Sequence, residues 1–258
     1  MTDGYLARQV AALDRDVEAV RRREPEGVHR ARIDCRRLRA VAPRGPLRDE
    51  LRWLGDQLSA ARDRYVVHQL LVRMVVEEPA GLVDPSVERR LERTYGGTRP
   101  SPDALDSPRF AALRAELAAL DPQPRVTRRR VRNELDRVVR RHRAVAERPG
   151  DDPAMHDLRK AAKRLRYTAE AWEPDGGKDA RRLAAAAKRL TQHLGERQDT
   201  VVVRAHLLRL AEAAAAEGEP AFTYGRLHAR EQARAAALDE ALPAVWERFT
   251  GPATRSTC

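Results

Sequence analysis

The stretch that decides the fold is Met155–Tyr167, MHDLRKAAKRLRY. On a helix each residue turns about 100° from the one before it, so four basic side chains of this stretch fall within about 80° of one another. These four are His156, Arg159, Lys163 and Arg166. The neighbouring and opposite side is apolar and carries Met155, Leu158, Ala162, Leu165 and Ala169. The pattern predicts one helix with an apolar flank for burial and a basic stripe that includes a histidine.

An earlier stretch, VHRARIDCRRLR at 28–39, has the same arrangement. Its basic stripe, at the same spacing, consists of His29, Arg32, Arg36 and Arg39. Its apolar flank consists of Val28, Ala31, Cys35, Leu38 and Ala42. Two copies of a basic-histidine helix predict an internal two-fold repeat with one shared polyanion site.

The composition favours helices packed on aliphatic stripes, because 34% of the 258 residues are charged and only 4% are aromatic. We therefore expect an all-α fold. The formal net charge is +11, and much of the excess comes from arginine. Arginine binds phosphate oxygens through a planar fork and keeps its charge at any working pH. A polyanionic partner is expected.

The two cysteines, Cys35 and Cys258, give no disulfide framework and no zinc spacing. The first residues, MTDGYLARQV, do not resemble a signal peptide, and no apolar run approaches the ~18 residues of a transmembrane helix. A reducing, cytoplasmic location and no membrane partner are expected.

Apolar periodicity and Pro/Gly breaks predict the helices along the chain. In the first half they cover about 3–23, 26–41, 47–76, 85–94 and 109–120, with a loop at 96–108. The apolar spacing of the first helix returns at Val131 to Val145, where His142 occupies an apolar position and is expected to be a satisfied core or cavity-edge histidine. The second basic-histidine helix then ends at Pro174, Gly176 and Gly177, and helices at about 178–216 and 220–249 follow. We expect one domain over 1–258, made of repeats at 1–122 and 123–258.

The elements that follow the two basic helices also match. LSAARDRYVV from Leu58 aligns with LGERQDTVVV from Leu194, which pairs Asp63 with Asp199. Upstream, Arg52 pairs with Lys188. The two aspartates could act as a general base, but we interpret them as structural residues that either pair with a basic side chain or cap a turn.

These paired motifs resemble the CHAD family, the conserved histidine α-helical domain. The second half carries HDLRKAAKRLRY at 156–167 and LGERQD at 194–199; the first carries HRARIDCRRLR at 29–39 and WLGDQLSAARD at 53–63. The resemblance implies two four-helix bundles related by pseudo-two-fold symmetry, with basic helices facing a central cavity or groove that binds inorganic polyphosphate. The first repeat departs from the second at Ser59, where the second has Gly195, and at Ile33, opposite Lys160.

Polyphosphate is a flexible chain of roughly evenly spaced charges, and a stripe of this spacing rises about 15 Å along a helix. Two facing stripes would flank such a chain. The predicted polyphosphate-binding residues are the cations and histidines of both stripes, their neighbours, and one cation on the next helix of each half. They are His29, Arg32, Arg36, Arg37, Arg39, Arg52, His156, Arg159, Lys160, Lys163, Arg164, Arg166 and Lys188.

Simpler interpretations of the same residues stay open. A basic stripe is more often a solvated helix face, although such faces usually interleave acids four residues away, and neither stripe contains one. His29 and His156 could be core residues, metal ligands or phosphate ligands. Because each lies with the arginines, we expect both to donate hydrogen bonds to phosphate.

No nucleotide-binding or hydrolase motif is present, and a metal-dependent phosphatase would need carboxylates that the stripes lack. We therefore expect a non-enzymatic protein without a cofactor or metal that binds polyphosphate or other phosphate and sulfate anions. A nucleic-acid-binding module is the alternative, but only Tyr167 adjoins a stripe as a stacking ring. A third possibility is a structural protein that docks an acidic protein partner.

Overall fold

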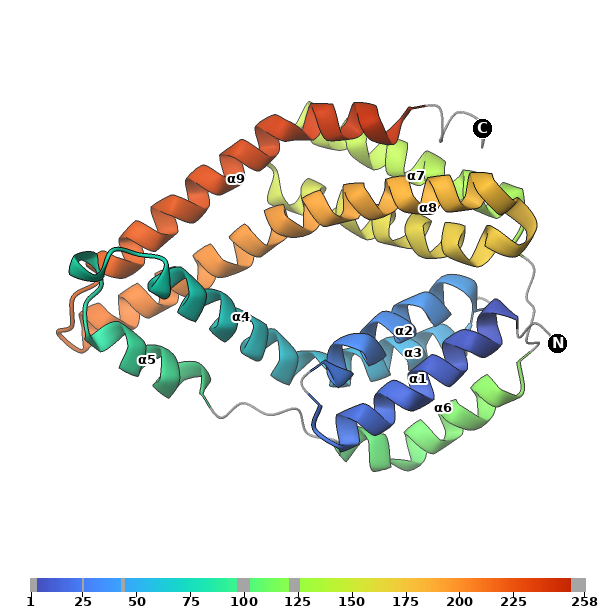
Figure 1. The fold of residues 1–258 in the computed structure, drawn as a ribbon, viewed down its shortest axis with the longest axis horizontal. Helices are drawn as coiled ribbons and strands as arrows, with labels where there is room; N and C mark the ends of the chain where they lie inside the picture. The colour runs from blue at the N-terminus through green and yellow to red at the C-terminus, as the bar shows by residue number, and fades with distance from the viewer. Residues whose placement is uncertain (1–3, 25, 43–44, 97–102, 121–125, 252–258) are drawn as a thin grey trace.

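The computed structural model shows an all-helical chain, as the composition predicts (Figure 1). It describes residues 4–24, 26–42, 45–96, 103–120 and 126–251, and for residues 60–63 the backbone only. Within these ranges the regular structure is entirely helical. The predicted loop at 96–108 therefore lies partly outside the described residues, and so do the side chain of Asp63 and residue Cys258.

The first half of the chain forms six helices in the part that the structure describes. They are α1 (Tyr5–Arg21), α2 (Gly27–Val41), α3 (Pro46–Gln57), α4 (Ser59–Val76), α5 (Ser86–Tyr95) and α6 (Pro108–Ala118). Short 3-10 turns lie at Ala80–Leu82 and Asp103–Asp106. The helical tract predicted from Leu47 to Val76 is divided at Leu58, where the hydroxyl of Ser59 donates to the carbonyl of Gly55 at 2.7 Å.

The second half forms α7 (Arg128–Glu147), α8 (Asp152–Ala216) and α9 (Phe222–Phe249). Within α8, Gly177 has φ 51° and ψ −126°, a conformation that costs glycine little and other residues much. Figure 1 shows the chain reversing direction here, so that the two arms of α8 lie side by side. The predicted break near Gly177 is confirmed.

Two apolar clusters hold the described residues together. The larger one joins α1, α2, α3 and α6 to α7, both arms of α8 and the end of α9. The smaller one joins α4 and α5 to the end of α8 and the start of α9. Each cluster draws on both halves of the sequence. The repeat boundary at 122/123 and the pseudo-two-fold symmetry stay predictions.

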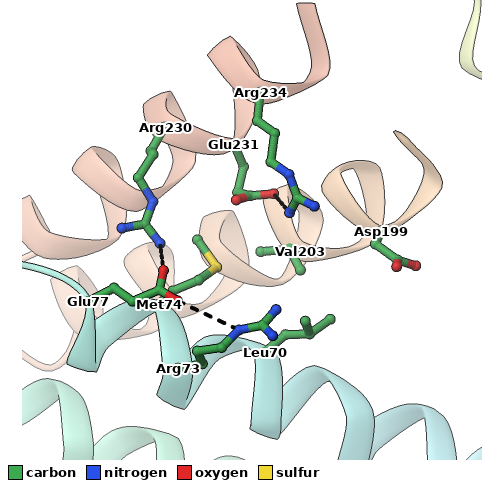
Figure 2. A pocket seen from close by; sticks show the side chains of 9 residues that line it. All are labelled: Leu70, Arg73, Met74, Glu77, Asp199, Val203, Arg230, Glu231 and Arg234. Atoms are coloured by element: carbon green, nitrogen blue, oxygen red, sulfur yellow. Dashed lines mark hydrogen bonds and ion pairs between the residues drawn. The ribbon is translucent and has the colours of Figure 1, made fainter. Parts of the chain in front are cut away.

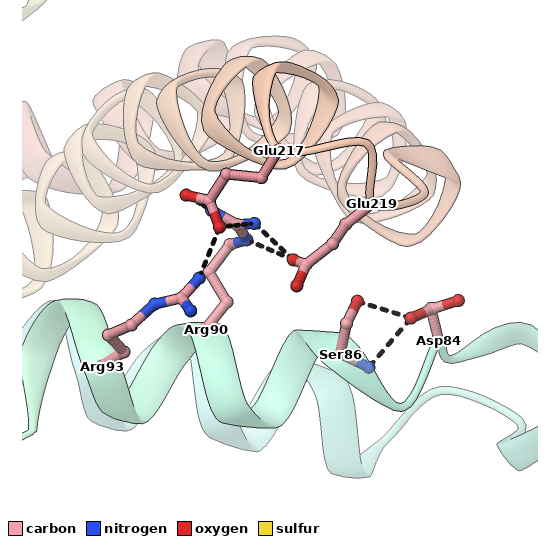
Figure 3. A network of polar contacts seen from close by, with 6 residues as sticks. All are labelled: Asp84, Ser86, Arg90, Arg93, Glu217 and Glu219. Carbon is pink, nitrogen blue, oxygen red and sulfur yellow. Dashed lines mark hydrogen bonds and ion pairs between the residues drawn. The ribbon is translucent and has the colours of Figure 1, made fainter.

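Arg90 of α5 forms ion pairs that link α5 to the end of α8 beside the smaller cluster (Figure 3). Its side chain is 3% exposed, and its guanidinium pairs with the carboxylates of Glu217 and Glu219 just after α8. A buried arginine is tolerated only when its charge is paired and its N–H groups are bonded, and both conditions are met here. The exposed Arg93 reaches the same Glu217 carboxylate at 2.9 Å.

His142 lies at the edge of the larger cluster, as predicted from its apolar position. Its ring stacks on Trp246 of α9, with centroids 3.6 Å apart and planes 4° from parallel. Burial lowers the pKa of His142, which favours the neutral ring at this contact.

Candidate functional site

A groove of about 880 Å³ lies among α2, α3, α7 and the first arm of α8. Ten arginine or lysine side chains and three carboxylates line it, a formal excess of seven positive charges. Six of the predicted binding residues are among the lining side chains. They are Arg36, Arg39, Arg52, Lys160, Lys163 and Arg164. The structure thus brings cations of both basic helices to one hollow.

The two stripes approach one another at Lys163. The pKa of Lys163 is lowered to about 7, mainly by burial. Arg159 on the same helix and Arg36 and Arg32 on α2 lower it further, whereas Asp199 opposes the shift. Burial also lowers the pKa of Arg159, and the buried Nε of that side chain has no hydrogen-bond partner among the described residues. A cluster of desolvated cations with an unsatisfied donor is electrostatically costly unless an anion enters it.

A second junction of the two helices lies at Arg39. Burial lowers the pKa of Arg39, and Arg52 of α3 and Arg164 of α8 lower it further, whereas Asp56 raises it. Cations from three helices therefore repel one another across the groove. Such repulsion is relieved by a bound polyanion and supplies affinity for it.

His156 is held by the second arm of α8. Its Nδ1 lies 2.8 Å from Oε1 of Gln198, so a neutral ring that donates there presents Nε2 as an acceptor. Donation from Nε2 to a phosphate oxygen then requires the charged ring. His29 is exposed on α2. Neither histidine lines the groove itself.

The segment that carries Gln198 is fixed by a buried arginine. Arg197 is 4% exposed, and its Nε donates to Asp239 of α9 at 2.8 Å. Its Nη2 lies 2.7 Å from Asp152 at the start of α8. This pairing ties together both arms of α8 and α9, and it supports the orientation of the neighbouring Gln198 and Asp199.

Five of the predicted cations have a carboxylate within ion-pair distance, and for Arg52 and Arg164 these are Asp49 at 3.8 Å and Glu134 at 3.9 Å. Arg37 of α2 and Arg166 of α8 share Glu170, at 3.2 and 2.8 Å. Lys160 lies 2.6 Å from Asp157. The Glu170 pairs join the two basic helices to each other, so Arg37 and Arg166 are partly neutralised before any ligand binds. Lys188 is exposed on the second arm of α8 and does not line the groove.

Sequence reasoning missed four arginines that line the groove: Arg48, Arg130, Arg137 and Arg140. Arg48 donates twice to the carbonyl of Ala42, and Arg130 donates to the carbonyls of Ala40 and Val41. They thereby satisfy the free carbonyls at the end of α2. The last carbonyls of a helix need hydrogen-bond donors, so the end of α2 in the sequence indicates that some donors must lie nearby. Only the packing of α3 and α7 identifies which arginines reach these carbonyls.

A second hollow, of about 460 Å³, lies among α4, α8 and α9 (Figure 2). Three arginines and three carboxylates line it, so its formal charges balance. Figure 2 shows Arg230 paired with Glu77 and Arg234 paired with Glu231, at 3.2 and 3.5 Å. This charge balance distinguishes it from the basic groove and does not favour a polyanion.

Comparisons with known proteins identify the family. The family model of the CHAD domain matches residues 4–208. The chain therefore belongs to the CHAD domain family. A crystal structure of the CHAD domain from the plant Ricinus communis is similar, with a TM-score of 0.67 and 27% identity over 95% of this chain and 89% of that one.

Two curated relatives come from Mycobacterium tuberculosis. They are the uncharacterized proteins Rv2226 (strain ATCC 25618 / H37Rv) and MT2285 (strain CDC 1551 / Oshkosh), each 32% identical over 90% of this chain. The match covers 49% of each relative, so the chain spans about half the length of these curated relatives. Among the described residues, no helix is long and apolar enough to cross a membrane.

Proposed function

We propose that this CHAD domain binds inorganic polyphosphate, or related phosphate and sulfate anions, in the basic groove without catalysing a reaction. The observation that supports this most is the excess of seven positive charges among the groove-lining residues, to which both basic helices, α3 and α7 contribute. The family is associated with polyphosphate binding, which agrees with that chemistry. We further propose that binding places the protein at polyphosphate granules.

The physical basis is relief of cation repulsion. Lys163 and Arg39 line the groove and are desolvated beside other cations, and Arg159 is one of those beside Lys163, which raises the energy of the empty groove. A polyanion replaces the lost hydration with charge-assisted hydrogen bonds and releases its counterions. A flexible chain of phosphates can follow the groove without needing a shaped pocket, so length and charge decide affinity.

The test is a calorimetric titration with polyphosphates of several defined lengths at three salt concentrations. We expect affinity to rise with chain length until the chain spans the groove, and log K to fall linearly with log salt concentration. Binding that is independent of length and salt would contradict the proposal.

Competition with RNA separates polyphosphate binding from the nucleic-acid alternative. Among the groove-lining residues the single aromatic ring belongs to Tyr167, which is 5% exposed and cannot offer a face to a base. Polyphosphate should therefore displace RNA at equal charge concentration and fixed salt. Displacement of polyphosphate by RNA would favour a nucleic-acid module.

A further inference from the structure

Lysine is rare in this chain. Of its 50 lysine and arginine residues, the lysines are Lys160, Lys163, Lys178 and Lys188. Three of them are exposed, and Lys160 is also paired with Asp157 at 2.6 Å. Lys163 differs from the others because it is half-buried at the groove and has no carboxylate within ion-pair distance among the described residues.

Charged groups act on Lys163 from its own helix, from α2 and from the second arm of α8. Arg159 lies on its own helix, Arg32 and Arg36 lie on α2, and Asp199 lies on the second arm of α8. Burial and the three guanidinium groups outweigh the aspartate and hold the pKa of Lys163 at about 7. About half of its amine is then uncharged at neutral pH, against less than about one in a thousand for an ordinary lysine.

We propose that Lys163 is a modification site, acylated by small acyl phosphates whose phosphate group is held by the surrounding arginines. The inference rests on the anion-binding groove proposed above and adds a covalent reaction to it. A nucleophilic amine beside several phosphate-binding guanidinium groups combines the two features that an acyl phosphate requires.

The reaction needs no further reactant. The lone pair of Nζ attacks the carbonyl carbon and forms the C–N bond, and the bond from that carbon to the phosphate oxygen then breaks. Inorganic phosphate leaves with the electron pair of the broken bond, and the proton lost from Nζ passes to phosphate or water. Guanidinium groups that hold the phosphate also stabilise the charge it carries as it leaves, so they favour both binding and departure.

Acylation would regulate the groove. The amide product carries no charge, so a modified groove loses one of its central cations and binds polyphosphate more weakly. Bound polyphosphate, in turn, covers Lys163 and favours its charged form, and both effects protect it from acylation. The chemical state of one side chain thereby links the supply of acyl phosphate to polyphosphate binding.

The experiment uses acetyl phosphate as the probe at pH 7.5 and measures the acetylation rate of each lysine by mass spectrometry. We expect Lys163 to react about tenfold faster than Lys160, because its larger uncharged fraction outweighs the lower intrinsic reactivity of a less basic amine. Inorganic phosphate should slow acetylation of Lys163 but not of Lys178. The control variant Lys178→Arg should leave the rate at Lys163 unchanged. Equal rates at the four lysines would overturn the proposal.

A second reagent tests the role of the arginines. The N-hydroxysuccinimide ester of acetic acid carries no phosphate, so its preference for Lys163 over Lys160 reports exposure and basicity alone. A preference at least about threefold larger with acetyl phosphate supports phosphate guidance. An equal preference with both reagents overturns it. If polyphosphate does not bind but acetyl phosphate still selects Lys163, the proposed function fails and the modification site stands.

Discussion

At the scale of single residues, Lys163 links the charge of the groove to pH. Its pKa is lowered to about 7 by burial and by Arg159, Arg36 and Arg32 in the ligand-free protein. A polyanion favours the ammonium form and raises that pKa, so binding must take up a proton at pH values just above 7. The ammonium contributes fully to binding below pH 7, and its contribution is lost as the pH rises.

We therefore predict that polyphosphate affinity falls between pH 7 and 9, by up to about tenfold per pH unit. Calorimetry at pH 8 in two buffers of different ionisation enthalpy measures the proton uptake directly. The Lys163→Arg variant keeps its charge throughout this range and should show a smaller uptake. Wild-type binding without proton uptake at pH 8 would contradict this role of Lys163.

At the scale of elements, close approach of helices makes some positions intolerant of substitution. A Cβ at Gly27 would lie 2.8 Å from the backbone nitrogen of Val20, where α2 starts against the end of α1. Gly81, in the first 3-10 turn, has open space around its Cα. We predict that Gly27→Ala lowers the free energy of unfolding by about 1–3 kcal/mol. Gly81→Ala is the matched control and should change the free energy of unfolding by less than about 1 kcal/mol. Urea denaturation measures both changes. Equal effects of the two substitutions would show that α1 and α2 are not in close contact.

The ion pairs of Arg90, which link α5 to the end of α8, provide a second prediction at this scale. Arg90→Ala removes a buried side chain and its hydrogen bonds to the partly exposed Glu217 and Glu219 carboxylates and should cost about 1–3 kcal/mol of unfolding free energy. Arg93→Ala removes an exposed partner of the same Glu217 and should cost less than about 1 kcal/mol. Thermal unfolding of both variants compares the two costs. A similar loss in both would mean that burial does not decide the strength of this network.

The sequence predicts the helices well because their signals are local. The apolar spacing and the Pro/Gly breaks place α2 and the turn at Gly177 correctly. The division at Leu58 is not evident, because the apolar pattern continues through it and Leu58 keeps helical torsion angles. The corresponding part of the second half, around Leu194, stays within one helix.

The site is only partly predictable, because the sequence signals are local and do not show how the helices pack on one another. The stripe spacing identifies Arg36, Arg39 and Lys163, because helix geometry alone puts them on one face. It does not reveal that Glu170 pairs with Arg37 and Arg166, since that pairing depends on how α2 packs on α8. Tertiary packing thus decides which predicted cations keep their charge available.

At the scale of the whole molecule, the position of the positive charge matters more than its total. The net charge of +11 is spread over the chain, but the groove concentrates seven excess charges from helices of both halves. Nonspecific attraction would depend only on the total net charge. Binding in the groove depends on the excess charge of the groove-lining residues. Two variants of equal net charge can therefore distinguish nonspecific attraction from binding in the groove.

The most direct measurement is therefore a polyphosphate titration of two quadruple variants at pH 6, where Lys163 is charged and the two variants have the same net charge. The groove variant replaces Arg36, Arg39, Lys163 and Arg164 by glutamine. The surface variant replaces four exposed arginines that do not line the groove, Arg22, Arg89, Arg181 and Arg182, by glutamine. With circular dichroism confirming equal helicity, we predict that the groove variant loses at least about 100-fold in affinity and about three units of salt slope, while the surface variant loses less than about fivefold. Equal losses in the two variants would contradict binding in the groove.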